Sequence, residues 1–242
     1  MTALITLLID EPLRMFLPAP DRVGVVRVGH DGSSSLGHLV QSVGVPLPEV
    51  GRLVVRESDV LASYRPQQGD LVHVRPVSRP QPLPPGERFV LDVHLGSLAR
   101  RLRLLGVDVA YERSADDVEL VNISLTQNRV LLTKDRGLLA RRALQHAAFV
   151  RGSAADEQLA DVLDRFAPAM APFTRCIACN GLVPRVPKDV VLSELEPGTA
   201  RSYDEFARCV DCARIYWRGA PAQQLDDVVR LAAHSSPVVR GN

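Results

Sequence analysis

The residues best suited to chemistry are four cysteines in two Cys-x-x-Cys pairs, Cys176 with Cys179 and Cys209 with Cys212. This spacing is a strong signal for zinc, because each pair forms a knuckle whose thiolates point at one ion. Four sulfurs complete the tetrahedral shell of Zn²⁺ and leave no open position. We therefore expect a structural ion that this small segment needs in order to fold. The alternatives are two disulfides, which a reducing compartment disfavours, or a redox-active iron site.

Three aspartates form a second candidate site. Asp92 directly follows an apolar run at residues 89–91, Asp117 opens a helix after a second strand, and Asp135 follows a third strand. Sites in open α/β sheets form beyond the carboxyl ends of the strands, so the three carboxylates are expected to converge. Because like charges held close repel each other, the pattern predicts a bound Mg²⁺ or Mn²⁺ ion. The chemistry it favours is metal-assisted hydrolysis of a phosphodiester.

Each aspartate also has a structural alternative. Asp116 and Asp117 suit a helix N-terminus, where carboxylates cap free N–H groups. Asp135 fits a turn or an N-cap equally well. Asp92 is the hardest to explain in this way, because a charge directly after an apolar strand needs a partner. Taken together, the three positions favour a site.

Basic residues belong to the helices that follow Asp92 and Asp135. Both helices start at the same edge of the expected sheet, and a cationic rim around an acidic pocket holds a nucleic-acid backbone. Ordinary solvated helix faces are the alternative. The expected RNA-contacting residues are Arg100, Arg101, Arg103, Lys134, Arg136, Arg141 and Arg142.

Aromatic residues follow the second cysteine pair. Tyr216 and Trp217 stand between Arg214 and Arg218. They can stack on bases or pack the small metal-binding segment, and the sequence leaves both interpretations open.

Alternating strands and helices between residues 87 and 166 must position the acids. Apolar residues recur at 95, 98, 99, 102 and 105, a helical stripe that Gly106 ends. Ser153 followed by Asp156 resembles a capping arrangement before the last helix. This order predicts a parallel sheet covered on both faces. Strands are expected at residues 89–91, 107–111, 130–133 and 147–150.

Residues 1–78 have the pattern of a small β-rich domain. Strands are expected at 3–9, 23–28, 53–56 and 70–74, and a helix at 36–43. The order β-β-α-β-β resembles the β-grasp, ubiquitin-like fold. The strings SLGHLVQSVGVP and QQGDLVHVRPV resemble the small sulfur-carrier proteins of that fold. Those carriers act through a terminal Gly-Gly, whereas this chain continues. A binding, positioning or purely structural module is therefore expected.

Prolines divide the chain. Five of them between Arg75 and Arg88 predict a semi-rigid linker, and a second break lies at residues 166–173. The expected division is a ubiquitin-like domain at 1–78, a linker at 79–87, an α/β domain at 88–170, a zinc ribbon at 171–220 and a tail at 221–242.

The composition is that of a globular protein. Of the 242 residues, 46% are hydrophobic and 24% are charged, and the net charge is +1. These values exclude general disorder and a grossly basic nucleic-acid coat protein. No run of eighteen apolar residues exists, and Asp10 and Glu11 come too early for a signal peptide, so a cytoplasmic protein without a membrane span is expected.

A family resemblance rests on five strings that keep their order from about Arg88 to Gly219. The chain resembles the Mut-7 C-terminal ribonuclease-like family in five strings. They are FVLDVHLGSLARRLRLLGVDV, DDVELVNIS, NRVLLTKDRGLLARR, RCIACNGLV and CVDCARIYWRG. The resemblance implies a PIN-like nuclease fold with a zinc ribbon, preceded in some members by a ubiquitin-like domain. One departure is Ala220-Pro221, where the family pattern often reads Ser-His.

The resemblance also implies roles for particular residues. It makes Asp92, Asp117 and Asp135 the acids that hold the catalytic metal. Asp156 is the candidate fourth acid, with Glu157 behind it.

The resulting expectation is a cytoplasmic, Mg²⁺- or Mn²⁺-dependent ribonuclease acting on RNA, such as tRNA or another structured RNA. The ubiquitin-like domain is expected to have a protein partner. A non-catalytic RNA- or ribosome-binding module is the second hypothesis, and a sulfur-transfer partner is the third. Acid clusters of this kind serve RNA and DNA alike, so only the resemblance favours RNA.

Overall fold

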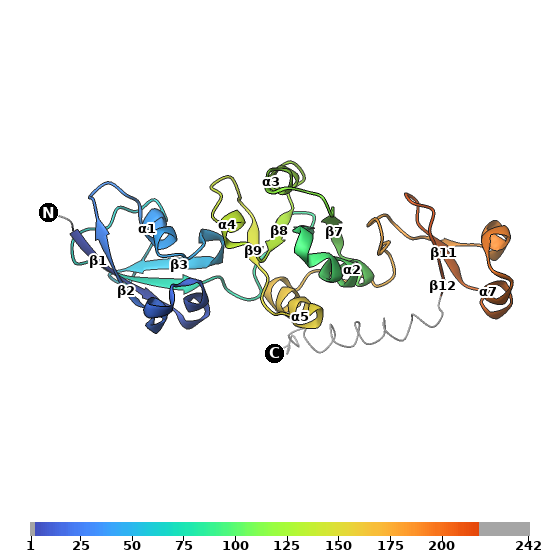
Figure 1. The fold of residues 1–242 in the computed structure, drawn as a ribbon, viewed down its shortest axis with the longest axis horizontal. Coiled ribbons are helices and arrows are strands. Elements are labelled where there is room, and N and C mark those ends of the chain that lie inside the picture. Colours follow the sequence, from blue (N-terminus) through green and yellow to red (C-terminus); the bar gives the residue numbers. More distant parts are fainter. Residues whose placement is uncertain (1–2, 218–242) are drawn as a thin grey trace. The chain divides into compact units, whose positions relative to one another are not determined.

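The computed structural model describes residues 3–217, and the chain divides into two compact units. The first unit combines Met1–Gln81 with Asp135–Phe149, and the second combines Pro82–Lys134 with the chain from Val150 onward. Figure 1 colours the chain along its sequence. The sequence-based division did not anticipate that residues 135–149 group with the N-terminal residues.

The first unit is built on a mixed sheet in the order β2-β1-β5-β3-β4. β1 and β5 are parallel, and the other neighbours are antiparallel. Side chains of β1 alternate between the two faces of the sheet, so Ile5 and Leu7 are buried while Leu4 is exposed. β4 was not predicted, because its Ser-Asp-Val sequence has no apolar alternation. The strands are β1 (Ala3–Ile9), β2 (Val25–His30), β3 (Val50–Val55), β4 (Ser58–Val60) and β5 (Leu71–Pro76).

One α-helix within residues 1–81 packs on this sheet, as the β-grasp expectation requires. It is α1 (Leu36–Ser42), and the Ser35 hydroxyl caps it by accepting from the N–H of His38. Leu39 and Val40 turn inward from its buried face. Short 3-10 turns complete this part, namely η1 (Glu11–Phe16), η2 (Ala19–Val23) and η3 (Leu47–Glu49).

The remainder of the first unit is α4 (Arg136–Leu139) and β9 (Ala147–Phe149). The Phe149 ring meets the Phe16 ring edge-on at 5.2 Å between centroids. The N–H of Phe149 donates to the Glu49 carboxylate at 2.8 Å. This segment therefore shares the core of the β-grasp fold.

The second unit holds the expected parallel strands β6 (Arg88–Leu91), β7 (Asp108–Tyr111) and β8 (Val130–Thr133). β6 lies between the other two and is parallel to both. β6 and β8 are short and strongly apolar, as is usual when helices cover both faces of a sheet, whereas only Val109 is buried in β7. Directly after β9, the N–H of Val150 donates to the carbonyl of Thr133 at 2.9 Å.

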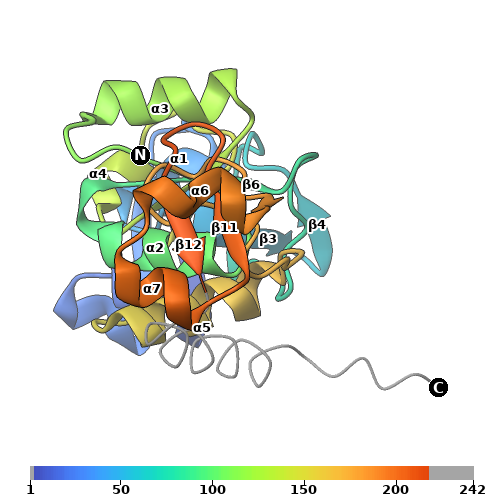
Figure 2. The same cartoon turned by 90° about the vertical axis from the view of Figure 1, so that its right-hand side faces the viewer.

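Helices cover both faces of this sheet (Figures 1 and 2). α3 lies on one face, and α2 and α5 pack against each other on the other. Gly106 ends the α2 segment with a φ of 81°, and a Cβ there would collide with the Ala171 carbonyl. The elements are η4 (Val93–Leu95), α2 (Gly96–Leu104), α3 (Asp117–Thr126) and α5 (Ala155–Phe166).

The ribbon is a small antiparallel sheet in the order β10-β11-β12, with short helices between its first two strands (Figure 2). Cys176, Cys209 and Val183 form its core, with Tyr216 packed against them. The elements are β10 (Arg185–Val186), α6 (Lys188–Val191), η5 (Leu192–Glu194), α7 (Pro197–Ser202), β11 (Phe206–Arg208) and β12 (Ile215–Trp217).

Three sequence observations lie outside the described residues, namely the basic residue at 218, the departure at Ala220-Pro221 and the tail at 221–242. Within residues 3–217, no helix has the length and apolar character needed to cross a membrane.

Candidate functional site

The four cysteines converge, with all their sulfur atoms within 4.8 Å of one another. The Sγ–Sγ distance is 3.6 Å from Cys176 to Cys212 and 3.4 Å from Cys179 to Cys209. Sulfurs bound tetrahedrally to Zn²⁺ at about 2.3 Å lie about 3.8 Å apart, so the cluster fits zinc. Among residues 3–217, no other group of three or more His, Cys, Asp or Glu side chains gathers this closely.

Each cysteine pair occupies a turn of the same form. The N–H of Asn180 donates to the carbonyl of Cys176 at 2.9 Å, and that of Ala213 to Cys209 at 3.1 Å. Asn180 and Ala213 both have left-handed backbones, with φ of 73° and 58°. A Cβ on Gly181 would lie 2.9 Å from the Cys209 sulfur. Glycine is therefore needed where the second turn approaches the first.

Electrostatics within the cluster favour a bound cation. Burial acts to raise the pKa of the Cys176 thiol, but hydrogen bonds from Tyr216 and from the backbone of Cys179 outweigh it and lower that pKa to about 6. The Tyr216 hydroxyl lies 3.0 Å from the sulfur. Burial, together with the neighbouring sulfurs, raises the pKa of Cys179 to about 12. Deprotonation of one cysteine is favoured, and deprotonation of the others is unfavourable unless a metal ion compensates the negative charge.

A polar network fastens the first cysteine turn to β7. Asp108 accepts from Arg129 at 2.7 Å and from the Asn180 amide at 2.9 Å, and it pairs with Arg175 at 3.1 Å. The Asn180 oxygen in turn accepts from the N–H of Val109 at 2.9 Å. Burial acts to raise the pKa of Asp108, but these partners outweigh it and hold that pKa below its usual value. Charge, as well as the chain itself, therefore joins ribbon and sheet.

Arg103 belongs to this junction and not to an exposed basic rim. Its side chain is only 3% exposed, and burial lowers the pKa of its guanidinium. The guanidinium donates to the carbonyls of Val109 at 3.0 Å, Ile177 at 3.2 Å and Ala178 at 2.9 Å. These bonds use its donors inside the protein, so we remove Arg103 from the expected RNA-contacting set.

Asp92 stands at the carboxyl end of β6 and is 3% exposed. One oxygen accepts from the N–H of His94 at 2.7 Å, which caps η4. The other accepts from the Thr133 hydroxyl and, at 3.4 Å, from the N–H of Lys134. None of these three donors carries a charge. Asp92 is thus a buried carboxylate tying the ends of two neighbouring strands together, where a cation is electrostatically favoured.

Asp117 occupies the first turn of α3 and is half-buried. The N-cap is its neighbour Asp116, which accepts from the N–H of Glu119 at 2.8 Å. The capping role proposed for both residues therefore falls to Asp116. Asp117 lies in the first turn of the helix, at the positive end of the helix dipole.

Glu112 is a further acid that sequence reasoning missed. Because Leu91 and Tyr111 are register partners, Glu112 follows β7 as Asp92 follows β6. Its side chain is exposed and accepts from the N–H of Arg113 at 3.0 Å. The signal that selected Asp92, an acid directly after a strand, would also have selected Glu112.

Asp135 and Arg136 lie in the first unit. Asp135 is the N-cap of α4 and accepts from the N–H of Gly137 at 2.7 Å. Arg136 donates to the carbonyl of Met15 at 2.9 Å, and its guanidinium lies 5.3 Å from the centre of the Phe16 ring. Both residues therefore have structural roles within the N-terminal unit.

Asp156, the candidate fourth acid, is exposed and pairs with Arg101 at 2.9 Å. The expected cap by Ser153 and Asp156 is wrong, because Glu157 does this work. Its carboxylate accepts from the N–H groups of Ser153 at 2.8 Å and Ala154 at 3.2 Å, which lowers its pKa. Asp156 is left with a surface ion pair, which is a weak interaction.

The remaining expected RNA-contacting residues are at the surface. In the second unit, Arg100 is exposed, and Lys134 is exposed while its ammonium group donates to the Gly152 carbonyl at 2.7 Å. In the first unit, Arg141 and Arg142 are exposed. Their contact with RNA stays a prediction.

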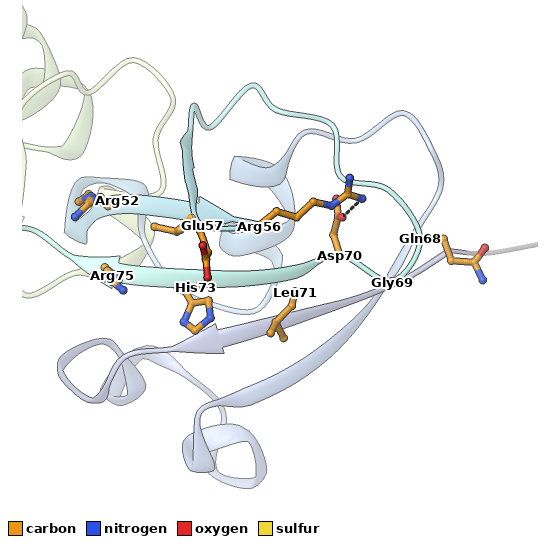
Figure 3. A pocket seen from close by; sticks show the side chains of 10 residues that line it. Arg52, Arg56, Glu57, Gln68, Gly69, Asp70, Leu71, His73 and Arg75 are labelled. Carbon is orange, nitrogen blue, oxygen red and sulfur yellow. Dashed lines mark hydrogen bonds and ion pairs between the residues drawn. The ribbon is translucent and has the colours of Figure 1, made fainter.

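A groove of about 580 Å³ lies on the β3–β5 side of the first unit (Figure 3). Two of its arginines already form ion pairs within the protein, Arg56 with buried Asp70 at 2.9 Å and Arg52 with Asp59 at 2.8 Å. Arg75 also lines it and is exposed. The groove thus offers a mixed polar surface rather than a concentrated anion site.

Two family models match the chain. The Mut7-C RNAse domain matches residues 87–229, more than half of the chain, and the Mut7-C ubiquitin domain matches residues 2–82. Both agree with the expected family and with the expected order of domains. No curated protein and no solved structure matches the chain.

Proposed function

Because the chain belongs to the Mut7-C RNAse domain family, we propose that it is a ribonuclease that hydrolyses RNA phosphodiester bonds with a divalent Mg²⁺ or Mn²⁺ ion. The position of Asp92 is the observation that supports a metal-dependent reaction. Asp92 is a buried carboxylate at the carboxyl end of a parallel strand, the position where α/β sheets place their sites, and its donors are neutral. An oxygen ligand of this kind suits a hard cation.

Asp92 and Asp117 belong to the same unit and would hold the ion, whereas a ligand role for Asp135, which belongs to the first unit, stays a prediction. The ion supplies charge neutralisation and activation of water at the phosphodiester. The protein's own contribution is to fix the Asp92 oxygens, since the His94 N–H and the Thr133 hydroxyl orient them before any ligand binds. Arg100 and Lys134 extend the site with positive charge for the RNA backbone.

Zinc in this proposal is structural. The four cysteines would hold one ion and leave no coordination position for a substrate. Because four cysteines without disulfide bonds are typical of a reducing compartment, we also propose a cytoplasmic location. The groove at β3–β5 is the surface we propose for a protein partner of the ubiquitin-like domain.

The test is a cleavage assay with zinc-loaded, full-length protein and labelled RNA pools that include tRNA, with and without Mn²⁺. Asp92→Asn should reduce cleavage at least about 100-fold, because removing one electrostatic contributor costs a factor of this order. Asp116→Asn is the matched control, since asparagine also caps helices well and activity should persist. Full activity in Asp92→Asn would overturn the metal-site assignment.

A non-catalytic RNA-binding module is the second candidate. The observation in its favour is that Asp92 and Asp135 both cap helical turns, so the fold has a use for them without any metal. RNA binding without Mn²⁺-dependent cleavage of any pool would decide for this module.

A further inference from the structure

We propose that a groove between the ribbon and the end of α2 binds an unpaired nucleobase of RNA. The groove has a volume of about 580 Å³ and lies within the second unit. Apolar and aromatic side chains dominate its lining, among them Leu104, Phe173, Ile177, Tyr216 and Trp217. The choice of RNA as ligand rests on the proposed function, whereas the groove itself does not.

The walls of the groove are held in place by contacts other than its lining side chains. The N–H of Phe173 donates to the carbonyl of Leu104 at 3.1 Å, which joins one wall to the end of α2. Arg103 donates to the carbonyl of Ile177 at 3.2 Å and so fixes the wall that the first cysteine turn forms. A groove that is formed before binding loses little conformational freedom when a ligand enters.

Two aromatic residues of the groove reach the surface. Phe173 has a left-handed backbone with φ of 67°, which is unfavourable for a bulky side chain and is found where the surroundings enforce it, often at binding sites. Trp217 ends β12 and is 42% exposed, although its register partner Phe206 is buried. Exposed aromatic faces of this kind are what unpaired bases stack on.

Charge favours a nucleotide over a purely apolar ligand. Arg185 lines the groove and is 82% exposed, and the lining also contains one acid, Glu205. Its ion pair with Glu205 is long, at 3.9 Å, and both partners are exposed, so the pair is weak. A phosphate attached to a stacked base can compete for this guanidinium with shorter, charge-assisted hydrogen bonds.

The chain provides its own reporter, because Trp217 is its single tryptophan. Zinc-loaded, full-length Asp92→Asn protein is titrated with an octamer of uridylate and with an abasic phosphodiester backbone of the same length. We expect saturable quenching of Trp217 fluorescence by the octamer and none by the abasic backbone. Phe173→Ala should weaken the octamer affinity roughly 5- to 100-fold, the range that one stacked base contributes.

Two control variants separate stacking from damage to the fold. Phe173→Tyr keeps an aromatic face and should retain most of the affinity. Leu182→Ala removes an exposed side chain of the same ribbon that does not line the groove, and it should leave the affinity unchanged.

Three results would overturn the proposal. Equal quenching by the abasic backbone would mean that only phosphate binds. Unaltered affinity in Phe173→Ala would mean that the base lies elsewhere. Absence of quenching, with Trp217 shielded from acrylamide, would mean that another occupant such as residues 218–242 fills the groove. Base-dependent quenching in a protein whose wild type cleaves no RNA would support the groove and refute only the ribonuclease proposal.

Discussion

Asp108 illustrates how much a single side chain can organise. It lies at the start of β7, yet it binds Arg129 from the segment before β8 and both Arg175 and Asn180 from the first cysteine turn. A carboxylate in a partly buried position is stable only with such partners. The segment that carries the cysteine cluster is therefore held against the sheet by a network that contains none of the four cysteines.

Replacing Asp108 tests this network. Asp108→Ala should lower the free energy of unfolding by about 3 kcal/mol at pH 7, since it deprives Arg129 and Arg175 of this carboxylate. Urea denaturation followed by circular dichroism measures this loss. Ser114→Ala, at an exposed position of the loop after β7, is the control and should be nearly neutral.

The pH dependence follows from the lowered pKa of Asp108. A carboxyl whose folded pKa lies below its unfolded value of about 3.9 contributes stability above that value, and the contribution is lost as pH falls through the folded pKa. The stability difference between wild type and Asp108→Asn should therefore narrow below about pH 4. A difference that stays constant from pH 7 to pH 3 would contradict the assignment.

At the scale of elements, the ribbon consists of short strands with a very small core. β10 has two residues, and β11 and β12 have three each. Such strands do not form a stable sheet alone, so the cysteine cluster must supply the missing free energy. The two cysteine turns share one backbone geometry, with a left-handed residue four positions after the first cysteine of each pair.

Removing one ligand should therefore unfold the ribbon. Cys209→Ala is expected to lose the bound zinc and the hydrogen-exchange protection of β11 and β12, because structural zinc contributes about 10 kcal/mol or more in small domains. Elemental analysis and amide exchange measure the two effects. Val190→Ala, at an exposed ribbon position, should keep both. Retained zinc with normal protection in Cys209→Ala would refute the metal's structural role.

At the scale of the whole molecule, the units of packing differ from the segments of the sequence. Residues 135–149 carry one of the three expected metal acids, Asp135, and yet they pack with residues 1–81. The buried Glu49 carboxylate, 1% exposed, accepts the N–H of Phe149, and Arg136 is held by Met15 and Phe16. The ubiquitin-like domain is therefore part of the support for this segment.

Glu49 provides the corresponding test. Glu49→Ala leaves the buried N–H of Phe149 without this acceptor and should lower the free energy of unfolding by about 1–3 kcal/mol. Glu49→Gln retains an acceptor oxygen and should recover most of that loss. Urea denaturation together with exchange of the Phe149 amide measures both. Equal destabilisation by the two variants would show that the hydrogen bond to Phe149 is not the reason for the effect.

The sequence by itself determined the features that depend on short spacing. The pairs that begin at Cys176 and Cys209 predicted one cluster, because two knuckles bring their thiolates together whatever connects them. Apolar runs predicted the three parallel strands, and the strand that ends before Asp92 put an acid at the carboxyl edge of the sheet. These signals are local, and the family match agrees with them.

Only the tertiary structure decided which side chains are free to act. Arg103 and Arg100 lie on the same helix, and the sequence alone gives no reason to treat them differently. Arg103 is buried against carbonyls of the ribbon, whereas Arg100 is exposed. Glu49 and Phe149 meet across 100 residues. Such partners are set by packing between distant segments, and no periodicity or spacing within either segment encodes them.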